Sequence, residues 1–107
     1  MIKKILWIAG CAVLLAGGVA QAANPAAGKE KSKSCAACHG VDGNSAAPDF
    51  PRLAGQHYDY LVKALSDYKS GERKNAIMAP QAANLSKRDI EDLAAYFAQQ
   101  PGLVVKY

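Results

Sequence analysis

The 107-residue sequence contains no stretch in which apolar and polar residues alternate, no internal repeat and no low-complexity tract. Alternation with a period of two is the signature of a half-buried strand, so its absence argues against a β-sheet. Apolar residues recur instead at helical spacing in the second half of the chain. The fold class predicted on this basis is all-α.

The long apolar run at the N-terminus is flanked by signals for export. Lys3 and Lys4 precede an uncharged run over residues 5–19, and small residues follow it at Ala20 and Ala22. A positive start, an apolar run and an A-x-A site are typical of a secretory signal peptide, so we expect the leader to be cleaved near Ala22. The alternative is a transmembrane anchor, which needs ~20 apolar residues, more than this run supplies.

The same leader holds Ile8-Ala9-Gly10-Cys11, which resembles a bacterial lipobox with an acylated cysteine. Too few apolar residues precede Cys11 to form the apolar region of a signal peptide. We therefore expect residues 1–22 to be removed and residues 23–107 to form one periplasmic domain, without a lipid anchor or stable membrane insertion.

Cleavage would leave a domain with a small net charge and few sulfur-containing residues. Removing two lysines takes the 13 basic residues to 11, against 9 acidic ones, so nucleic-acid binding has no support. The remaining sulfur lies in Cys35, Cys38 and Met78. So small a domain usually needs a cofactor, a metal or disulfides, and a bridge between cysteines this close would close only a tiny loop. The composition therefore predicts a large apolar cofactor in the core.

The sequence SCAACHG, residues 34–40, places Cys35 and Cys38 two residues apart, with His39 directly after them. A contiguous C-x-x-C-H is typical of haem attachment, in which each thiol reacts with one vinyl group and the histidine becomes an axial ligand of the iron. A zinc site would need further ligands, of which His57 is the one strong candidate, and a thioredoxin-like disulfide would need a βαβ context. We predict one covalent haem c, with His39 as an iron ligand.

A sixth ligand for the iron is predicted at Met78, the one methionine of the mature chain. A lone methionine is usually core filler, but Met78 lies in a proline-containing stretch without a helical stripe. Its thioether is a common haem ligand. The competitor is His57, which lies at the start of an amphipathic segment and is expected to be exposed there.

Capping residues and apolar stripes predict three helices, separated by two irregular stretches. Asn24 and Ser86 are capping residues, and Asp89 completes a capping box with Ser86. The helices run from Asn24-Pro25 into the cysteine motif, from about His57 to Gly71, and from Ser86 to Pro101-Gly102; the irregular stretches cover residues 40–55 and 72–84. One stripe of the second helix carries Tyr60, Leu61, Ala64, Leu65 and Tyr68, and the buried face of the last helix is expected to carry Ile90, Leu93, Ala94 and Phe97.

Four stretches of the mature chain, CAACHG, APDFPRLAGQ, YLVKALSDYKSGERKNAIMAP and LAAYFA, resemble the small class I c-type cytochromes. The likeness is greatest to bacterial cytochrome c-553 and to single domains of cytochrome c4, and it covers essentially the whole mature chain. The resemblance implies three to five short helices around one covalent haem. It also implies His39 as proximal ligand, Met78 as distal ligand, and the carbonyl of Pro51 as acceptor for the second ring N–H of His39.

The resemblance further places Gly28 and Tyr96 where the first and last helices cross. Some family members bind a haem propionate through a tryptophan, which the mature chain lacks. Residues that would replace it are Arg52, Gln56 and Asn75. The family's dihaem cytochrome c4 proteins have two such domains, whereas this chain has one motif.

The resemblance implies one-electron transport between respiratory redox partners, without catalysis. The partners would be membrane oxidases or reductases, or other cytochromes, and the encounters would be transient. Lys29, Lys31 and Lys33 would steer an acidic partner, unless they form an ordinary solvated face. A peroxide-reducing enzyme or a gas sensor is the first alternative, and it would require an iron that Met78 leaves readily. A permanently docked subunit of a larger oxidase or reductase is the second.

Overall fold

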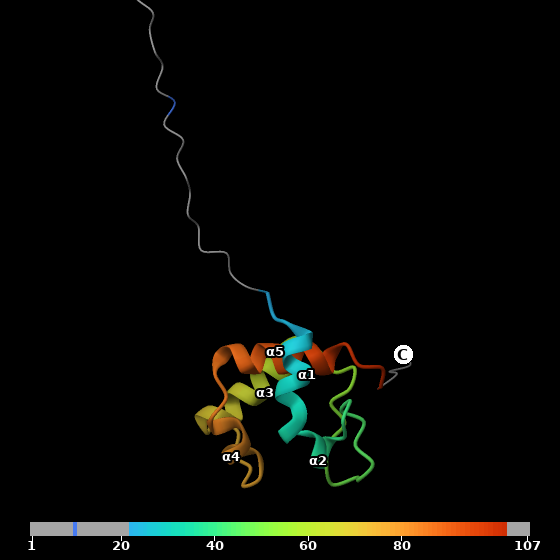
Figure 1. Cartoon of the computed structure of the whole chain (residues 1–107). Helices are drawn as coiled ribbons and strands as arrows, with labels where there is room; N and C mark the ends of the chain where they lie inside the picture. Colours follow the sequence, from blue (N-terminus) through green and yellow to red (C-terminus); the bar gives the residue numbers. More distant parts are fainter. Residues whose placement is uncertain (1–9, 11–21, 103–107) are drawn as a thin grey trace, which may run out of the picture.

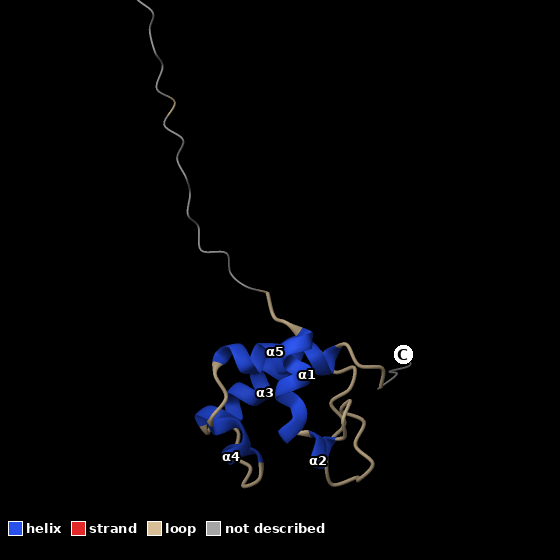
Figure 2. Cartoon of the chain, viewed as in Figure 1, coloured by secondary structure: helices blue, strands red, loops and turns tan. Residues whose placement is uncertain are grey.

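The computed structural model describes Gly10 and residues 22–102. Apart from Gly10 and Ala22, the predicted signal peptide and its lipobox cysteine lie outside the described residues, and its cleavage stays a prediction. The described chain forms α1 (Pro25–Lys31), a 3-10 turn η1 (Ser32–Ser34), α2 (Ala36–His39), α3 (Tyr58–Ser70), α4 (Met78–Ala83) and α5 (Lys87–Ala98) (Figure 1). It has no strand over residues 22–102 (Figure 2), which confirms the all-α prediction. No helix in that part is long and apolar enough to cross a membrane.

The first predicted helix is divided into three pieces. Asn24 begins α1, where its side chain accepts hydrogen bonds from Ala26 N and Ala27 N, at 3.0 and 3.2 Å. At the end of α1 the hydroxyl of Ser32 donates to Lys29 O at 2.7 Å. Such side-chain bonds to the backbone compete with the helix, and the chain tightens there into η1 before α2 carries the cysteine motif.

Helices α1 and α5 cross in close contact (Figure 1). A Cβ on Gly28 would lie 2.0 Å from Asp92 O and 2.8 Å from Tyr96 Cβ, so glycine is required for this approach. The close packing brings the start of the described domain against its last helix. The crossing at Gly28 and Tyr96 is the one that the family resemblance implied.

A buried carboxylate stabilises the same helix crossing. Asp92 is 2% exposed, and it accepts hydrogen bonds from Asn24 N at 2.8 Å and from Lys31 Nζ at 2.7 Å, with Arg88 Nε at 3.3 Å. Lys31 also pairs with Asp89 at 2.9 Å. Burial alone raises the pKa of Asp92, but the bonds from Lys31 and Asn24 outweigh it and hold the pKa below its usual value.

These contacts change the expectation for the lysines before the cysteine motif. Lys31 is bound to two carboxylates, and the exposed Lys33 pairs with Glu30 at 2.9 Å. Two of the three predicted steering charges are therefore largely compensated within the domain, and a steering role for the cluster loses support.

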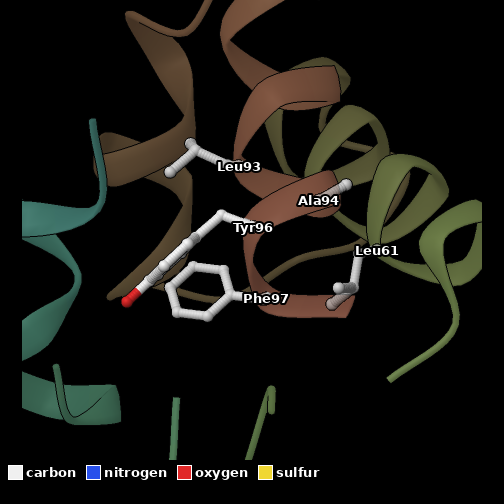
Figure 3. Close-up of a cluster of buried hydrophobic side chains, with 5 residues drawn as sticks. All are labelled: Leu61, Leu93, Ala94, Tyr96 and Phe97. Carbon is white, nitrogen blue, oxygen red and sulfur yellow. The ribbon is translucent and has the colours of Figure 1, made fainter. Parts of the chain in front are cut away.

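The hydrophobic core lies between α3 and α5 and contains Leu61, Leu93, Ala94, Tyr96 and Phe97 (Figure 3). Ser86 and Asp89 form the predicted capping box of α5, and the face predicted to be buried is buried. The predicted end of α3 is also confirmed. Gly71 follows it with φ +87°, a left-handed conformation that glycine adopts without strain.

The prediction that residues 72–84 are entirely irregular is wrong, because Met78–Ala83 form α4. Pro80 is the third residue of α4 and does not interrupt it. The first N–H groups of a helix have no partner within it, so proline is tolerated there. Asn75 supplies the hydrogen bonds that begin the turn.

Candidate haem site

A cavity opens between α2, α3, α4 and α5 and the loop before α3, and the four strongest candidates from the sequence all lie on its wall. These are Cys35, Cys38, His39 and Met78. Much of the remaining wall is apolar and includes Leu53, Leu61, Leu65, Leu85, Leu93 and Phe97. Several of these side chains also belong to the core or pack against it, so the cavity is continuous with the hydrophobic interior.

The two cysteines face the cavity because one helical turn separates them. Cys38 N donates to Cys35 O at 3.2 Å, and His39 N donates to the same oxygen at 2.9 Å. Both thiols are half-buried and no disulfide joins them. Burial raises the pKa of the Cys35 thiol. The turn therefore presents two separate sulfur atoms to one cavity.

The imidazole of His39 is held in one orientation. The ring is buried, and its Nδ1 lies 2.8 Å from Pro51 O, a carbonyl that can only accept, so Nδ1 carries the proton. Nε2 is left with its lone pair available to a metal. Phe50 packs edge-on against the ring with centroids 6.4 Å apart. This is the arrangement that the resemblance implied for a proximal ligand.

The loop that carries Pro51 is fixed by its own backbone. Gly43 O accepts from Leu53 N at 2.8 Å and from Ala54 N at 3.2 Å. Gly43 has φ +85°, and a Cβ there would lie 2.8 Å from both Ala54 N and Phe97 Cδ1. Glycine is therefore required, for backbone conformation and for space. The loop is thus positioned against α5.

Met78 reaches the cavity from the first residue of α4, where it is half-buried. Its N–H donates to Asn75 Oδ1 at 2.9 Å. The preceding segment contacts α3 through Arg73, whose guanidinium donates to Tyr60 Oη at 3.3 Å and lies 4.7 Å from the centre of the Tyr68 ring.

The secondary candidates are divided by the structure. Arg52, Gln56 and Asn75 line the cavity. Gln56 Oε1 accepts from His57 N at 2.9 Å and Asn75 Oδ1 accepts from Met78 N, so a propionate contact would use the amide nitrogens of these residues as donors. His57 is exposed before α3 and is not part of the wall. Arg73 also lines the cavity, and it was not predicted from the sequence. The signal that could have indicated it was its position between the end of a helix and Met78.

These residues fit a haem c. The cavity offers two thiols for covalent attachment, an imidazole with its Nε2 lone pair available, a thioether and an apolar wall. Over residues 22–102 no group of three or more His, Cys, Asp or Glu side chains is arranged to hold a metal ion. Two thiols, an imidazole and a thioether around one apolar cavity are the donor set of a c-type haem protein.

Comparison with known proteins agrees with this class. Residues 25–101 match the family model described as Cytochrome c, and the chain belongs to that family, as a class I c-type cytochrome similar to cytochrome c4. The predicted family, fold and covalent haem c are thereby confirmed.

Two relatives and one solved structure define the likeness. The chain is 52% identical over 84 residues to cytochrome c4 of Pseudomonas aeruginosa, covering 78% of this chain and 42% of that one. It is 45% identical over 82 residues to cytochrome c-554(548) of Halomonas halodenitrificans, covering 74% and 99%. The crystal structure of reduced recombinant cytochrome c4 from Pseudomonas stutzeri superposes with a TM-score of 0.73 at 48% identity, covering 78% and 48%. The chain thus spans less than half the length of these cytochrome c4 proteins.

Proposed function

We propose that residues 23–107 form a periplasmic one-electron carrier, with its haem bound through Cys35 and Cys38 and ligated by His39 and Met78. The observation that carries the proposal is that one apolar cavity brings these four side chains together, with His39 already oriented by Pro51. Export rests on the signal-peptide pattern of residues 1–22.

Bound haem c supplies an iron centre that accepts and releases one electron. The chain's own residues set the conditions for that exchange. The Pro51 carbonyl fixes the His39 tautomer and raises its basicity, and the apolar wall excludes water. Met78 would hold the iron through its thioether, which would favour the reduced state and leave little access for a substrate. The domain is accordingly proposed to have no catalytic residue of its own.

The proposed partners are redox proteins met in transient encounters. A relative in Stutzerimonas stutzeri, 43% identical, is named as the electron acceptor of thiosulfate dehydrogenase. A relative in Chlorobaculum tepidum, 39% identical, is named as the cytochrome subunit of sulfide dehydrogenase. The second name favours the alternative that this chain is a fixed subunit. Co-purification at a constant ratio with one redox enzyme would establish that alternative, and isolation as a free cytochrome would exclude it.

The ligand assignment is tested by changing Met78 in the haem-loaded protein. Oxidised wild type is expected to show the weak band at the red end of the visible spectrum that iron–thioether bonding produces. Met78→His should keep the haem attached, abolish that band and lower the midpoint potential by roughly a quarter to a half of the ~0.8 V that axial ligands span. Met78→Ala should admit carbon monoxide to the reduced iron.

The matched control is His57→Ala, because His57 is exposed and lies off the cavity wall. This variant should keep the red band and the wild-type potential. If wild type lacks the band, and His57→Ala rather than Met78→Ala admits carbon monoxide to the reduced iron, the second ligand is His57 and the assignment is wrong.

A further inference from the structure

The turn that leads into α4 is organised by one side chain. Asn75 Oδ1 accepts from Ile77 N and from Met78 N, both at 2.9 Å, and the backbone oxygen of Asn75 accepts from Ala79 N at 3.0 Å. One residue therefore binds the N–H groups of three consecutive residues, and Met78 is the middle one.

Few buried side chains fix the backbone of Met78, although α4 packs against α3. Helix α4 has six residues, too few to be stable alone, and Ala82 is its one buried residue. Ile77, directly before Met78, is 57% exposed. Side-chain burial therefore contributes little at this end of α4. The hydrogen bonds to Asn75 orient the backbone of the first turn.

Asn75 is itself anchored to the framework through its neighbours. Arg73 N donates to Asp67 O at 3.1 Å, and the Arg73 guanidinium contacts Tyr60 and Tyr68 on α3. Beyond α4, Lys69 Nζ donates to Leu85 O. The segment that carries Met78 is thus bound to α3 at both ends. Asn75 lies within this segment, and its hydrogen bonds connect the bound end to the turn that holds Met78.

We infer that Asn75 is a positioning residue for Met78, holding its thioether at the iron against competing ligands. This inference rests on the ligand assignment proposed above. It also gives Asn75 a role besides the propionate contact expected from the sequence, because that contact would use the amide nitrogen as donor, whereas the carbonyl oxygen accepts from the backbone. A looser Met78 would leave the iron more often, and an added ligand would then compete more successfully.

The test is an imidazole titration of the oxidised, haem-loaded protein, followed through the red thioether band. Asn75→Ala should bind imidazole about fivefold more tightly, the factor that corresponds to losing one side-chain cap. Asn75→Ser keeps a neutral acceptor and should lie between Asn75→Ala and wild type. The matched control is Asn84→Ala, the same substitution at an exposed residue beyond the other end of α4 and off the cavity wall.

The outcomes separate this inference from the ligand assignment. If wild type lacks the red band, or Met78→Ala retains it, the ligand assignment fails and the inference fails with it. If that assignment holds but Asn75→Ala binds imidazole no more tightly than Asn84→Ala, the positioning role alone is overturned. If Asn75→Ala does not accumulate as a folded protein, Asn75→Ser decides, and an affinity equal to that of wild type overturns the inference.

Discussion

The α1–α5 crossing and the α4 segment stabilise the domain by different means. Among α5 residues, seven are buried, including the carboxylate of Asp92, and α1 meets them through Gly28. Helix α4 buries Ala82 alone. Its start is held by the exposed Asn75, whose Oδ1 accepts from Met78 N, and the segment before it is bound to α3 through the exposed Arg73, which donates to Tyr60 Oη. Damage to the crossing should therefore unfold the domain, whereas damage at α4 should change how the iron is ligated while the fold persists.

The largest effect is expected from loss of the haem, because the α1–α5 crossing and the α4 segment both adjoin the core that it would fill. In the double variant Cys35→Ala, Cys38→Ala the haem has no covalent attachment. Leu61, Leu93 and Phe97 line the cavity as well as the core, so the core would be left open. The helices are marginal alone, since the longest has 13 residues. Circular dichroism should show loss of most native helix.

Ala37→Ser is the control for that double variant, since it changes an exposed residue between the two cysteines. It should retain native helix, and its intact mass, like that of wild type, should include one haem that acidified organic solvent does not extract. A haem-free double variant that still unfolds cooperatively from a helical state would show that the cofactor is not part of the core.

A smaller but still global effect is expected at the helix crossing. Gly28→Ala places a Cβ within 2.0 Å of Asp92 O, so α1 must move away from α5. Such overpacking should lower the free energy of unfolding by about 2–3 kcal/mol, measured by urea denaturation of the haem-loaded protein. The red thioether band of the folded fraction should be unchanged, because Met78 is held elsewhere.

Gly71→Ala gives the comparison for that variant. A Cβ on Gly71 meets nothing within 4 Å, and the positive φ of +87° is its one obstacle. This variant should cost about 1 kcal/mol. Equal losses in the two variants would mean that the crossing is less tightly packed than the structure indicates.

The acid stability of the crossing should differ from that of the α4 side. The N–H of Ser86 and the ammonium of Lys31 lower the pKa of Asp89 to about 2, and the pKa of Asp92 is also lowered. Both lie below the unfolded value of ~3.9, so their stabilisation is complete above about pH 5 and is lost as the pH falls toward 2. Urea midpoints measured from pH 6 to pH 2 should decline most steeply over that interval.

Asp92→Asn isolates the buried member of that network. It should destabilise the domain by about 2 kcal/mol at pH 6, because hydrogen bonds to a buried charge are lost, and it should flatten the decline below pH 4. The control is Asp67→Asn, which removes the pairing with Lys63, a side chain that is 72% exposed. It should change the midpoint little. An equally steep acid decline in Asp92→Asn would contradict this assignment.

The parts of the fold that the sequence predicted are those with local signals. The capping box of Ser86 and Asp89 and the glycine after α3 are visible within a few residues. Helix α4 was not predicted because six residues are too few to show periodicity, and a proline inside so short a segment is more typical of a loop. The partnership of Lys31 with Asp92 joins residues 61 apart, and a charged residue inside a buried helical face is not expected from pattern alone.

The site divides in the same way. Cys35, Cys38 and His39 follow from one contiguous motif, because a single helical turn brings them together. Pro51 and the family role of Met78 came from resemblance to known sequences. The contacts of Arg73 with Tyr60 and Tyr68 depend on how the segment after α3 folds back, which residue spacing does not encode.

The hydrogen bond between His39 and Pro51 has a consequence for how this site tolerates mutation. Its acceptor is a main-chain oxygen, which every amino acid at position 51 would supply equally. Point mutation therefore reaches the bond by displacing the loop, and the loop's path depends on Gly43, where a side chain has neither a suitable conformation nor space. Substitution of the acceptor residue should therefore change the orientation of the iron-binding ring little. Substitution eight residues earlier, at a glycine that takes no part in the hydrogen bond, should change it more.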